Sequence, residues 1–439
     1  MKKIIEPKIS PGFIELLPED QIIFNKMINT ISKTYEQFGF SPIDTPVLEI
    51  SEVLLAKAGG ETEKQVYSLK KGDTDLTMRF DLTVPLARYI AKNQNLINFP
   101  FKRYQIGKVW RGEKPQKGRF REFYQCDIDI VGDGELSIIN DAEIPAVIYN
   151  TFKNLGFENF TIKINNRKIL TGLFEYLNVS DKSLEILRII DKLEKIGIEK
   201  IREEFLLIEL NDENINFIIN FITVSGNSVE ICQKLSELKI ENEKFIKGLE
   251  ELLLVSKYIS NFGIPNANFK IDLTIARGLD YYTGTVYETI LNDYPQIGSV
   301  CSGGRYDDLA GFFTEKKLPG VGISIGLSRL FYQLKENNFI KSNIQTTMQA
   351  LIIPMGENLS YALEVATELR NNGLKIGVYL ENKKFNKKLN YANKLQVPYI
   401  IIIGENEINE RKITLKCMKT GEQESIDFEN ISLKLLNKF

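Results

Sequence analysis

The stretch "RYQIGKVWRGEKPQKGRFREFYQCDIDIVG", residues 103 to 132, contains two alternating runs joined by a short polar loop. On the second run, Arg121, Gln125 and Asp129 fall on one face. The other face carries mostly apolar residues: Phe120, Tyr124, Ile128 and Ile130. A two-residue period is the pattern of a β-strand. The stretch therefore predicts a long hairpin in a sheet that has one apolar face and one polar floor.

The loop of this hairpin concentrates positive charge. It follows Arg111 and contains three further cations: Lys114, Lys117 and Arg119. Cations at a hairpin tip are suited to binding a polyphosphate or the end of an RNA. A solvated, lysine-rich loop without a ligand is the alternative explanation for the loop alone. That alternative does not explain the polar face of the strand.

A second stretch, "LTIARGLDYYTGTVYE" at 273 to 288, begins as a strand and then becomes polar. The run that leads into it alternates, with these residues on its apolar face: Phe269, Ile271, Leu273 and Ile275. Arg277 keeps the parity of that face. Because a buried guanidinium is costly to desolvate, we expect either a bound anion or a fixed internal carboxylate beside it.

Composition limits the possible classes of protein. A chain of 439 residues predicts two or three domains. With 43% hydrophobic residues, 26% charged residues and a net charge of −2, it has no general cationic field for nucleic acid, so such a partner would need a local patch. We find no signal peptide and no run long enough to span a membrane, and expect a cytoplasmic protein without a membrane partner. Its four cysteines lack paired spacing, which favours free thiols.

The chain contains no histidine. This excludes Ser-His-Asp and Cys-His nucleophile systems, histidine zinc sites and every imidazole general base. The chemistry of an enzyme with this composition must depend on carboxylates, arginines and tyrosines, with Mg²⁺ as a compatible metal ion. These groups suit the positioning and charge stabilisation of a phosphate reaction.

The N-terminal half predicts a mixture of helices and strands. Residues 20–38 predict a helix, and in "FGFSPIDTPVLEI" Pro42 and Pro46 confine the chain to an extended or edge conformation. Thr83 is placed to cap the next helix, with Pro85 in its first turn. Two further elements are expected: a helix near 140–154 and the strand "FTIKIN" at 160–165.

Between about 175 and 262 the pattern changes to consecutive amphipathic helices. Ile186, Ile189 and Ile190 keep helical spacing, and "SGNS" at 225–228 predicts a turn and a cap. This region predicts an all-helical insertion.

A small alternating unit follows a polar linker near 335–347. It begins with "MQALIIPM" and continues through a helix at 357–372 that Gly373 ends. The strand "KIGVYLE", a lysine-rich helix and the apolar strand "YIIII" come next. The order predicts a parallel sheet of about 90 residues.

Two glycine-containing segments complete the candidate site. "GSVCSGGRYDDLAGFF" places Gly303 and Gly304 in a sheet region, where missing side chains let a ligand approach the backbone. "LPGVGISIGLSRLFYQL" predicts a strand that enters a helix, with Arg329 near its first turn. It departs from the dinucleotide fingerprint because Ile325 occupies the position of the third glycine. An arginine beside a helix N-terminus can still hold phosphate.

Together these segments resemble the histidyl-tRNA synthetase family of class II aminoacyl-tRNA synthetases, from about residue 7 to the C-terminus. "FGFSPIDTPVLE" resembles the first class motif, the hairpin the second and "LPGVGISIGLSRL" the third. "ARGLDYYTGTVYE" and "CSGGRYDDL" resemble two stretches particular to the histidine enzyme. The resemblance implies an α+β fold: an antiparallel-sheet catalytic core with a helical insertion, and a C-terminal α/β anticodon-binding domain. The implied ranges are 1–174 and 263–335 for the core, 175–262 for the insertion and 345–439 for the last domain.

The resemblance also implies roles for individual residues. Arg111 and Arg277 would act in catalysis, Arg277 on the α-phosphate as the substrate carboxylate attacks phosphorus. ATP would be held by Arg111, Glu113, Arg119 and Arg329. L-Histidine would be bound by Asp81, Thr83, Gln125, Asp129, Tyr281, Tyr282, Gly303 and Gly304. Of these, Asp81, Thr83 and Gln125 would take the α-ammonium group. Asp129 and Tyr282 would each face one imidazole nitrogen; many family members carry glutamate where Asp129 stands.

The implied partners are tRNA(His), histidine, ATP with Mg²⁺, and a second copy of the chain in a homodimer. The residues expected to contact tRNA are Gln116, Lys117, Arg121, Lys384 and Lys387. For the lysine-rich helix, a solvated surface is the alternative. tRNA binding through so few charges should be sensitive to salt.

Two other functions stay open at this point. One is a catalytically silent, synthetase-like regulatory or RNA-binding subunit, although such relatives commonly lack the C-terminal domain or the ATP-binding arginines. The other is a class II synthetase for another amino acid, against which the "RGLDYY" stretch argues.

Overall fold

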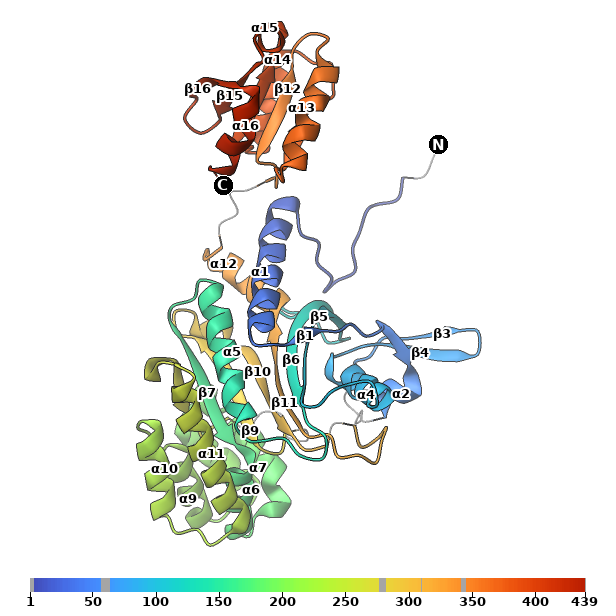
Figure 1. Cartoon of the computed structure of the whole chain (residues 1–439). Coiled ribbons are helices and arrows are strands. Elements are labelled where there is room, and N and C mark those ends of the chain that lie inside the picture. The colour runs from blue at the N-terminus through green and yellow to red at the C-terminus, as the bar shows by residue number, and fades with distance from the viewer. Residues whose placement is uncertain (1–3, 57–63, 276–281, 309, 341–344, 439) are drawn as a thin grey trace. The chain divides into compact units, whose positions relative to one another are not determined.

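An eight-stranded sheet forms the centre of residues 27–337 in this computed structural model (Figure 1). Its strand order is β1 (Ser41–Pro42), β5 (Phe101–Trp110), β6 (Glu122–Val131), β11 (Gly320–Gly326), β10 (Ser299–Tyr306), β9 (Thr285–Leu291), β7 (Phe160–Asn166) and β8 (Phe269–Ile271). Neighbouring strands are antiparallel except for the outermost pairs, β1 with β5 and β7 with β8. The α+β class and the long hairpin β5–β6 are confirmed, and Pro42 lies on an edge strand as predicted.

Helices cover the apolar face of this sheet. The helices concerned are α1 (Pro18–Gln37), α5 (Asn140–Asn154) and α12 (Leu327–Glu336). The Tyr35 hydroxyl of α1 donates to the Cys126 carbonyl of β6 over 3.2 Å. Arg305 of β10 forms a buried ion pair with Asp141 of α5, with Nη2 and Oδ1 2.7 Å apart. The opposite face, which carries the polar side chains, is therefore left available for a ligand.

Residues between 48 and 78 form a smaller, three-stranded sheet. Its order is β2 (Leu48–Ile50), β4 (Thr74–Met78) and β3 (Ser68–Lys71), with α2 (Ser51–Leu55) and α4 (Thr83–Asn93) next to it in sequence. The Arg79 guanidinium ties the end of β4 to the main sheet, because its Nε donates to the Lys108 carbonyl over 2.9 Å. This contact fixes where the chain enters α4.

The helices predicted between 175 and 262 are present. They follow α6 (Arg167–Tyr176) and the short η1 (Ser180–Lys182), and they are α7 (Ser183–Ile190), α8 (Leu193–Leu207), α9 (Asp212–Ile222), α10 (Ser228–Glu237) and α11 (Glu243–Asn261). Asn227 and Glu230 form a complete capping box at α10, as "SGNS" indicated. Glu251 of α11 joins this group to the sheet by accepting from Asn166 at the end of β7 over 2.9 Å.

The strand predicted to continue through Ile275 is shorter than expected. β8 ends at Ile271, and Asp272 then forms a turn in which its Oδ1 accepts from the Thr274 amide over 3.1 Å. Aspartate competes for backbone hydrogen bonds in this way. Leu273 and Ile275 are nevertheless buried, as their parity predicted. Two short 3₁₀ turns, η2 (Asn266–Asn268) and η3 (Pro295–Ile297), precede β8 and β10.

The second unit has its own sheet, in the order β13 (Ile376–Val378), β12 (Ala350–Pro354), β14 (Tyr399–Ile403), β15 (Lys412–Cys417) and β16 (Gln423–Asp427). Its helices are α13 (Leu359–Asn371), α14 (Phe385–Lys394), α15 (Glu405–Glu410) and α16 (Phe428–Leu436). The first three strands are parallel, as predicted. The prediction of a purely parallel sheet is wrong, because β15 and β16 add an antiparallel hairpin.

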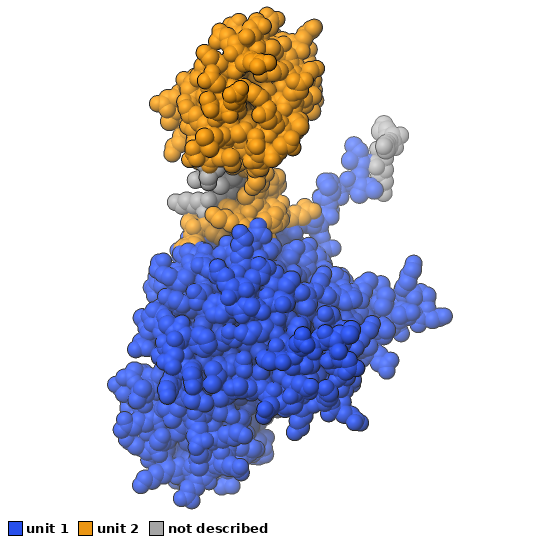
Figure 2. Space-filling view, in the orientation of Figure 1, with its two compact units in different colours: residues 1–14, 27–337 blue, residues 15–26, 338–439 orange. Residues whose placement is uncertain are grey.

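The described residues are 4–56, 64–275, 282–308, 310–340 and 345–438. They group into one unit of residues 1–14 and 27–337 and a second of residues 15–26 and 338–439 (Figure 2). Within these ranges, no helix is both long enough and apolar enough to cross a membrane.

Candidate active site

The floor of the site is the polar face of β5, β6 and β11. Asp129, Asp127 and Gln125 of β6 project from it, since alternate residues of a strand share a face. Their cross-strand partners on β5 are Arg103, Gln105 and Gly107, and those on β11 are Gly322, Ser324 and Gly326. The small residues of β11 leave space above the sheet: a Cβ at Gly322 would lie 2.2 Å from Asp129 Oδ1.

A cavity of about 370 Å³ opens at one end of this floor. Its lining includes three cations and one acid that the sequence predicted for nucleotide binding: Arg111, Arg119, Arg329 and Glu113. Arg111 is fixed in place, because its Nε donates to the Phe80 carbonyl over 3.0 Å and its guanidinium lies 5.2 Å from the centre of the Phe123 ring. Arg329 Nη2 donates to the Ile297 carbonyl over 2.8 Å. Three converging guanidinium groups are suited to a polyphosphate.

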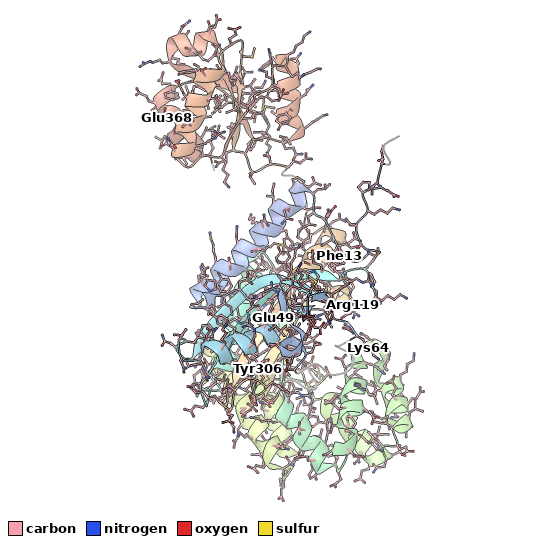
Figure 3. The ribbon with its side chains drawn as sticks, turned by 90° about the vertical axis from the view of Figure 1, so that its right-hand side faces the viewer. Phe13, Glu49, Lys64, Arg119, Tyr306 and Glu368 are labelled. Carbon is pink, nitrogen blue, oxygen red and sulfur yellow. The ribbon has the colours of Figure 1, made fainter. Side chains whose placement is uncertain are left out.

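The loop between β5 and β6 carries Arg119 to this cavity (Figure 3). The Arg119 amide donates to the Gln116 carbonyl over 2.9 Å, and Gly118 takes a positive φ of 74°, which closes a tight turn. The Lys117 side chain at the tip is 85% exposed and forms a long ion pair, 3.7 Å, with Glu336. The tip thus presents charge to solvent, as a contact to RNA would require.

Arg121 has a different environment from the rest of the loop. Its Nε donates to the Glu113 carbonyl over 3.1 Å, and its backbone amide donates to the Gly12 carbonyl over 2.8 Å. Its own carbonyl accepts from the Arg111 amide over 2.9 Å. Arg121 therefore connects the N-terminal segment to both ends of the loop.

A second, smaller cavity lies further along β6 and shares Ser324 with the first. Its lining includes these side chains: Thr83, Asp127, Asp129, Tyr282 and Tyr306. Asp129 is held on both oxygens, since Oδ2 pairs with the fully buried Arg103 and Oδ1 accepts from the Tyr306 hydroxyl over 2.9 Å. Burial raises the pKa of Asp129 to about 6, against the lowering effect of Arg103. It stays ionised above that pH and presents a fixed acceptor.

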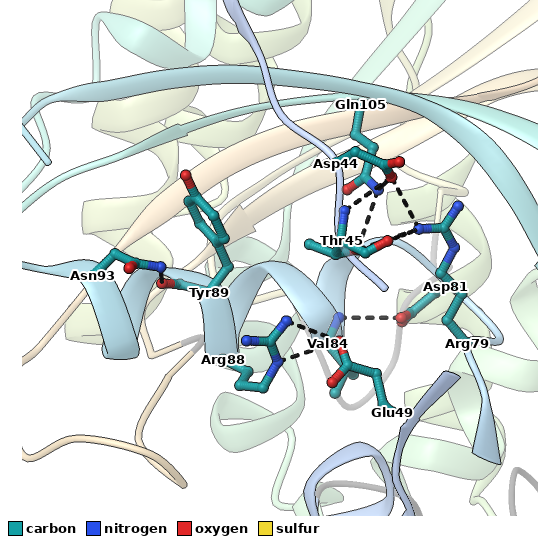
Figure 4. Close-up of polar contacts among 10 residues, drawn as sticks. All are labelled: Asp44, Thr45, Glu49, Arg79, Asp81, Val84, Arg88, Tyr89, Asn93 and Gln105. Carbon is teal, nitrogen blue, oxygen red and sulfur yellow. Dashed lines mark hydrogen bonds and ion pairs between the residues drawn. The ribbon is translucent and has the colours of Figure 1, made fainter. Parts of the chain in front are cut away.

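Asp81 lies two residues before α4 (Figure 4), whose first residue, Thr83, lines the smaller cavity. The prediction that Thr83 caps this helix is wrong. The helix begins at Thr83 itself, and Asp81 Oδ1 accepts from the Val84 amide over 3.1 Å in its place. Burial raises the pKa of Asp81 above its usual range, while the Val84 amide and then Arg111 lower it. Arg88 of the same helix pairs with Glu49 of β2 at 2.9 Å, which fixes the helix against the smaller sheet.

Several predicted residues have other positions. Arg277 and Tyr281 lie outside the described residues. Gly304 lies under Tyr282, where a Cβ would be 2.8 Å from the ring. Gly303 falls on the opposite, helix-covered side of β10, and a Cβ there would be 2.6 Å from Ile323 Cα. Close packing of β10 against β11 is therefore enough to explain why position 303 is a glycine.

The sequence reasoning missed Arg103 and Asp127, although a signal for both was present. Asp127 has the parity of Gln125 and Asp129, and Arg103 is the residue that hairpin register places opposite Asp129. Pairing the residues of the two strands one by one, starting from the loop of the hairpin, would have identified both residues. Arg103 has no exposed surface, and its Nε and Nη1 have no hydrogen-bond partner within the described ranges.

In the second unit, the two lysines that were predicted to contact tRNA are exposed: Lys384 is the N-cap residue of α14, and Lys387 lies in its first turn. Lys388 is different, because it is 7% exposed and its Nζ donates to the Pro354 carbonyl over 2.7 Å. The lysine-rich helix thus has one structural lysine and an exposed basic edge.

Among the described residues, no group of three or more cysteine, aspartate or glutamate side chains is arranged to hold a metal ion. Of the residues that line the larger cavity, only Glu113 is an acid. This donor set fits an ion that arrives with a phosphate ligand rather than one bound by the protein alone.

Two protein-family models together match most of the chain. A sequence model described as histidyl-tRNA synthetase matches residues 12–330, and one described as anticodon binding domain matches residues 349–438. A histidine–tRNA ligase of Clostridium tetani is 60% identical over 429 residues, covering 98% of both chains. A histidine–tRNA ligase of Finegoldia magna is 48% identical and covers 98% of this chain and all of the relative.

Solved structures of histidyl-tRNA synthetases also resemble this chain. A histidyl-tRNA synthetase of Nostoc sp. PCC 7120 superposes with a TM-score of 0.93 at 39% identity, covering 99% of this chain and 100% of that one. A Bacillus halodurans protein described as an ATP phosphoribosyltransferase regulatory subunit/histidyl-tRNA synthetase gives 0.76 at 21% identity, covering 91% and 99%. The second likeness is one of fold alone.

Proposed function

Because this chain belongs to the histidyl-tRNA synthetase family and is a histidine–tRNA ligase, we propose roles in that reaction for the residues of its two cavities. The enzyme activates histidine with ATP and transfers it to the 3′ end of tRNA(His). The observation that carries this function is the 60% identity, over nearly the whole of both chains, to a histidine–tRNA ligase, with the C-terminal domain included.

ATP occupies the larger cavity. Arg111, Arg119 and Arg329 bind its phosphates, and Glu113 lies on the adenine side. Three guanidinium groups at one cavity support this assignment, since arginine forms paired, directional hydrogen bonds to phosphate. Mg²⁺ would be held mainly by the phosphate oxygens of ATP and would offset the charge of the triphosphate, since the one acid in the cavity lining, Glu113, lies on the adenine side.

In the activation step, a carboxylate oxygen of histidine attacks the α-phosphorus. A carboxylate–phosphorus bond forms, the bond to the β-phosphate oxygen breaks, and pyrophosphate leaves with the electron pair. Arg111 and Arg277 stabilise the negative charge that develops on the α-phosphate, in a site that needs little reorganisation. No imidazole of the protein takes part, because the chain has none.

Histidine occupies the smaller cavity. Asp81, Thr83 and Gln125 bind its α-ammonium group, and Gln125 Oε1 has no other hydrogen-bond partner in the described part of the chain. Asp129, Tyr281 and Tyr282 surround the imidazole, and Gly304 leaves space beneath the Tyr282 ring, whereas Gly303 lies on the other face of β10 and has no part in the cavity. An analogue that lacks a ring N–H leaves buried polar groups unpaired, which supports strong discrimination.

Gln116, Lys117 and Arg121 lie on the loop that meets the acceptor end of tRNA(His), and Lys384 and Lys387 contact the anticodon region. Exposure of the loop tip and of the basic edge of α14 supports these contacts.

We also propose a homodimer and a division of the chain into a core of 1–174 and 263–335, an insertion of 175–262 and an anticodon-binding domain of 345–439. Apolar side chains that are 38–53% exposed gather on and beside the smaller sheet, and a second copy would cover them: Val47, Leu48, Ile50 and Leu69.

Charging of tRNA tests this function. The purified chain should attach labelled histidine to a tRNA(His) transcript, and the product should resolve from free tRNA on an acid gel. A transcript for another amino acid is the control. A folded chain that charges neither transcript would favour a catalytically silent, synthetase-like regulatory or RNA-binding subunit.

A further inference from the structure

Asp127 is a buried carboxylate in the middle of the site floor. It lies on β6 between Gln125 and Asp129 and shares their face, opposite Gln105 on one side and Ser324 on the other. The residue is 3% exposed, lines the smaller cavity, and its Oδ1 has no hydrogen-bond partner in the described residues. A buried carboxylate oxygen without a partner is costly, so such an oxygen facing a cavity indicates a missing donor.

The charges around this cavity do not balance within the described chain. Three acids lie there, Asp81, Asp127 and Asp129, against two cations: Arg103 acts on all three acids, and Arg111 acts on Asp81. Arg103 already pairs with Asp129 Oδ2. The pKa of Asp127 is raised to about 7, chiefly by burial and to a smaller degree by Asp129 and Asp81, with Arg103 and Ser324 acting to lower it. The cavity thus has room for one more positive charge.

The substrate supplies that charge. At neutral pH the α-ammonium group of histidine is a cation with three N–H donors. Residues two apart on a strand are separated by about 6.7 Å, comparable with the distance from the α-nitrogen to the imidazole ring. When the imidazole ring lies at Asp129, the amino-acid end of histidine points along β6 toward Gln125. The α-nitrogen then comes within reach of Asp127, which lies between them.

We propose that Asp127 binds the α-ammonium group of histidine, together with Asp81 and Gln125. This inference rests on the proposed placement of histidine in the smaller cavity. It makes Asp127 part of the substrate site rather than a mere counter-charge for Arg103. If Asp127 only balanced Arg103, its removal would weaken every ligand of the cavity to the same degree.

Two analogues of histidine separate these explanations. Histidinol keeps the ammonium group and replaces the carboxylate with an alcohol, whereas imidazolepropionate keeps the carboxylate and lacks the ammonium group. Both should inhibit histidine-dependent ATP–pyrophosphate exchange by the full-length enzyme. The variant is Asp127→Asn, which keeps the shape and removes the charge. The control is Asp133→Asn, a partly exposed aspartate two residues beyond β6.

We expect Asp127→Asn to raise the KM for histidine and the inhibition constant of histidinol at least tenfold. The inhibition constant of imidazolepropionate and the KM for ATP should change less than twofold, and Asp133→Asn should behave as the parent. Equal weakening of both analogues, or no change in either, would overturn the proposal. If Asp127→Asn does not fold, Asp127→Glu must show the same split, because its carboxylate is displaced by one methylene. Failure of imidazolepropionate to inhibit the parent enzyme would instead count against the placement of histidine in this cavity.

Discussion

Single charged residues decide the chemistry of this molecule, and most of them lie on one strand face. Asp129 and Asp127 have raised pKa values because they are buried, and Arg103 below them lowers both. The folded state therefore binds protons more tightly at these positions than the unfolded chain does. Burial of these two acids in the empty site therefore costs folding free energy once the pH is high enough to ionise them.

This cost gives a pH-dependent prediction for Asp127→Asn. With a folded pKa of about 7 against an ordinary value of 3.8, the folded state loses stability relative to the unfolded chain as pH rises from about 4 to about 7. Asparagine cannot ionise, so the variant escapes this loss. Between pH 5 and pH 8 its stability should improve relative to the parent by roughly 2–3 kcal/mol. Denaturation midpoints measured at both pH values would check this; a constant or shrinking difference would contradict it.

Arg277 provides a second prediction at this scale. Arg277→Ala should fold almost normally and should slow ATP–pyrophosphate exchange by a factor of about 10² to 10³, which is the usual effect of removing one donor that stabilises transition-state charge. Arg188→Ala, at an exposed position of α7, is the control and should exchange at the parental rate. Normal exchange in a folded Arg277→Ala variant would refute the assigned role.

Among the elements, the loop between β5 and β6 depends on a segment far from it in sequence. Gly12 takes a positive φ of 87°, and a Cβ there would lie 2.9 Å from Arg121 Cγ. The Phe13 ring packs edge-on against Tyr67, with centres 6.5 Å apart. Residues 11–13 thus hold Arg121, and Arg121 holds the Glu113 backbone beside the ATP cavity.

Arg121→Ala should therefore raise the KM for ATP in pyrophosphate exchange, an assay without tRNA, roughly three- to tenfold. Gly12→Ala should have the same effect, because its side chain displaces Arg121 without removing it. The KM for histidine should stay near the parental value in both. If both variants exchange normally and only tRNA charging declines, Arg121 contacts tRNA and does not position the loop.

How far the sequence predicts these elements depends on how local their determinants are. The hairpin β5–β6 and the helices between 183 and 261 follow from hydrophobic period and capping residues, which act over a few positions. The end of β8 at Ile271 and the role of Asp81 in place of Thr83 depend on competing hydrogen bonds of aspartate. The pairing of Arg103 with Asp129 depends on register between strands, which the alternation of either strand alone does not fix.

For the whole molecule, the exposed apolar side chains of β2 and its neighbours lead to a prediction about assembly. Leu48 and Ile50 are 40% and 53% exposed and lie on the same face of one short strand, on either side of the buried Glu49. Ile50→Glu should shift the protein from dimer to monomer in sedimentation velocity and lower its exchange activity, since a buried unpaired charge disfavours the interface. Leu207→Glu, at an 81% exposed residue of α8, should leave both unchanged. A parent protein that sediments as a monomer would refute the homodimer.

The most direct measurement for the whole account is ATP–pyrophosphate exchange by the purified protein with Mg²⁺, run separately with each common amino acid. Exchange depends on both cavities at once, because label enters ATP only if an aminoacyl adenylate forms reversibly. We predict exchange with histidine and with no other amino acid. Exchange with a different amino acid, or none at all from a protein shown to be folded, would contradict the assignment of the two cavities to ATP and histidine.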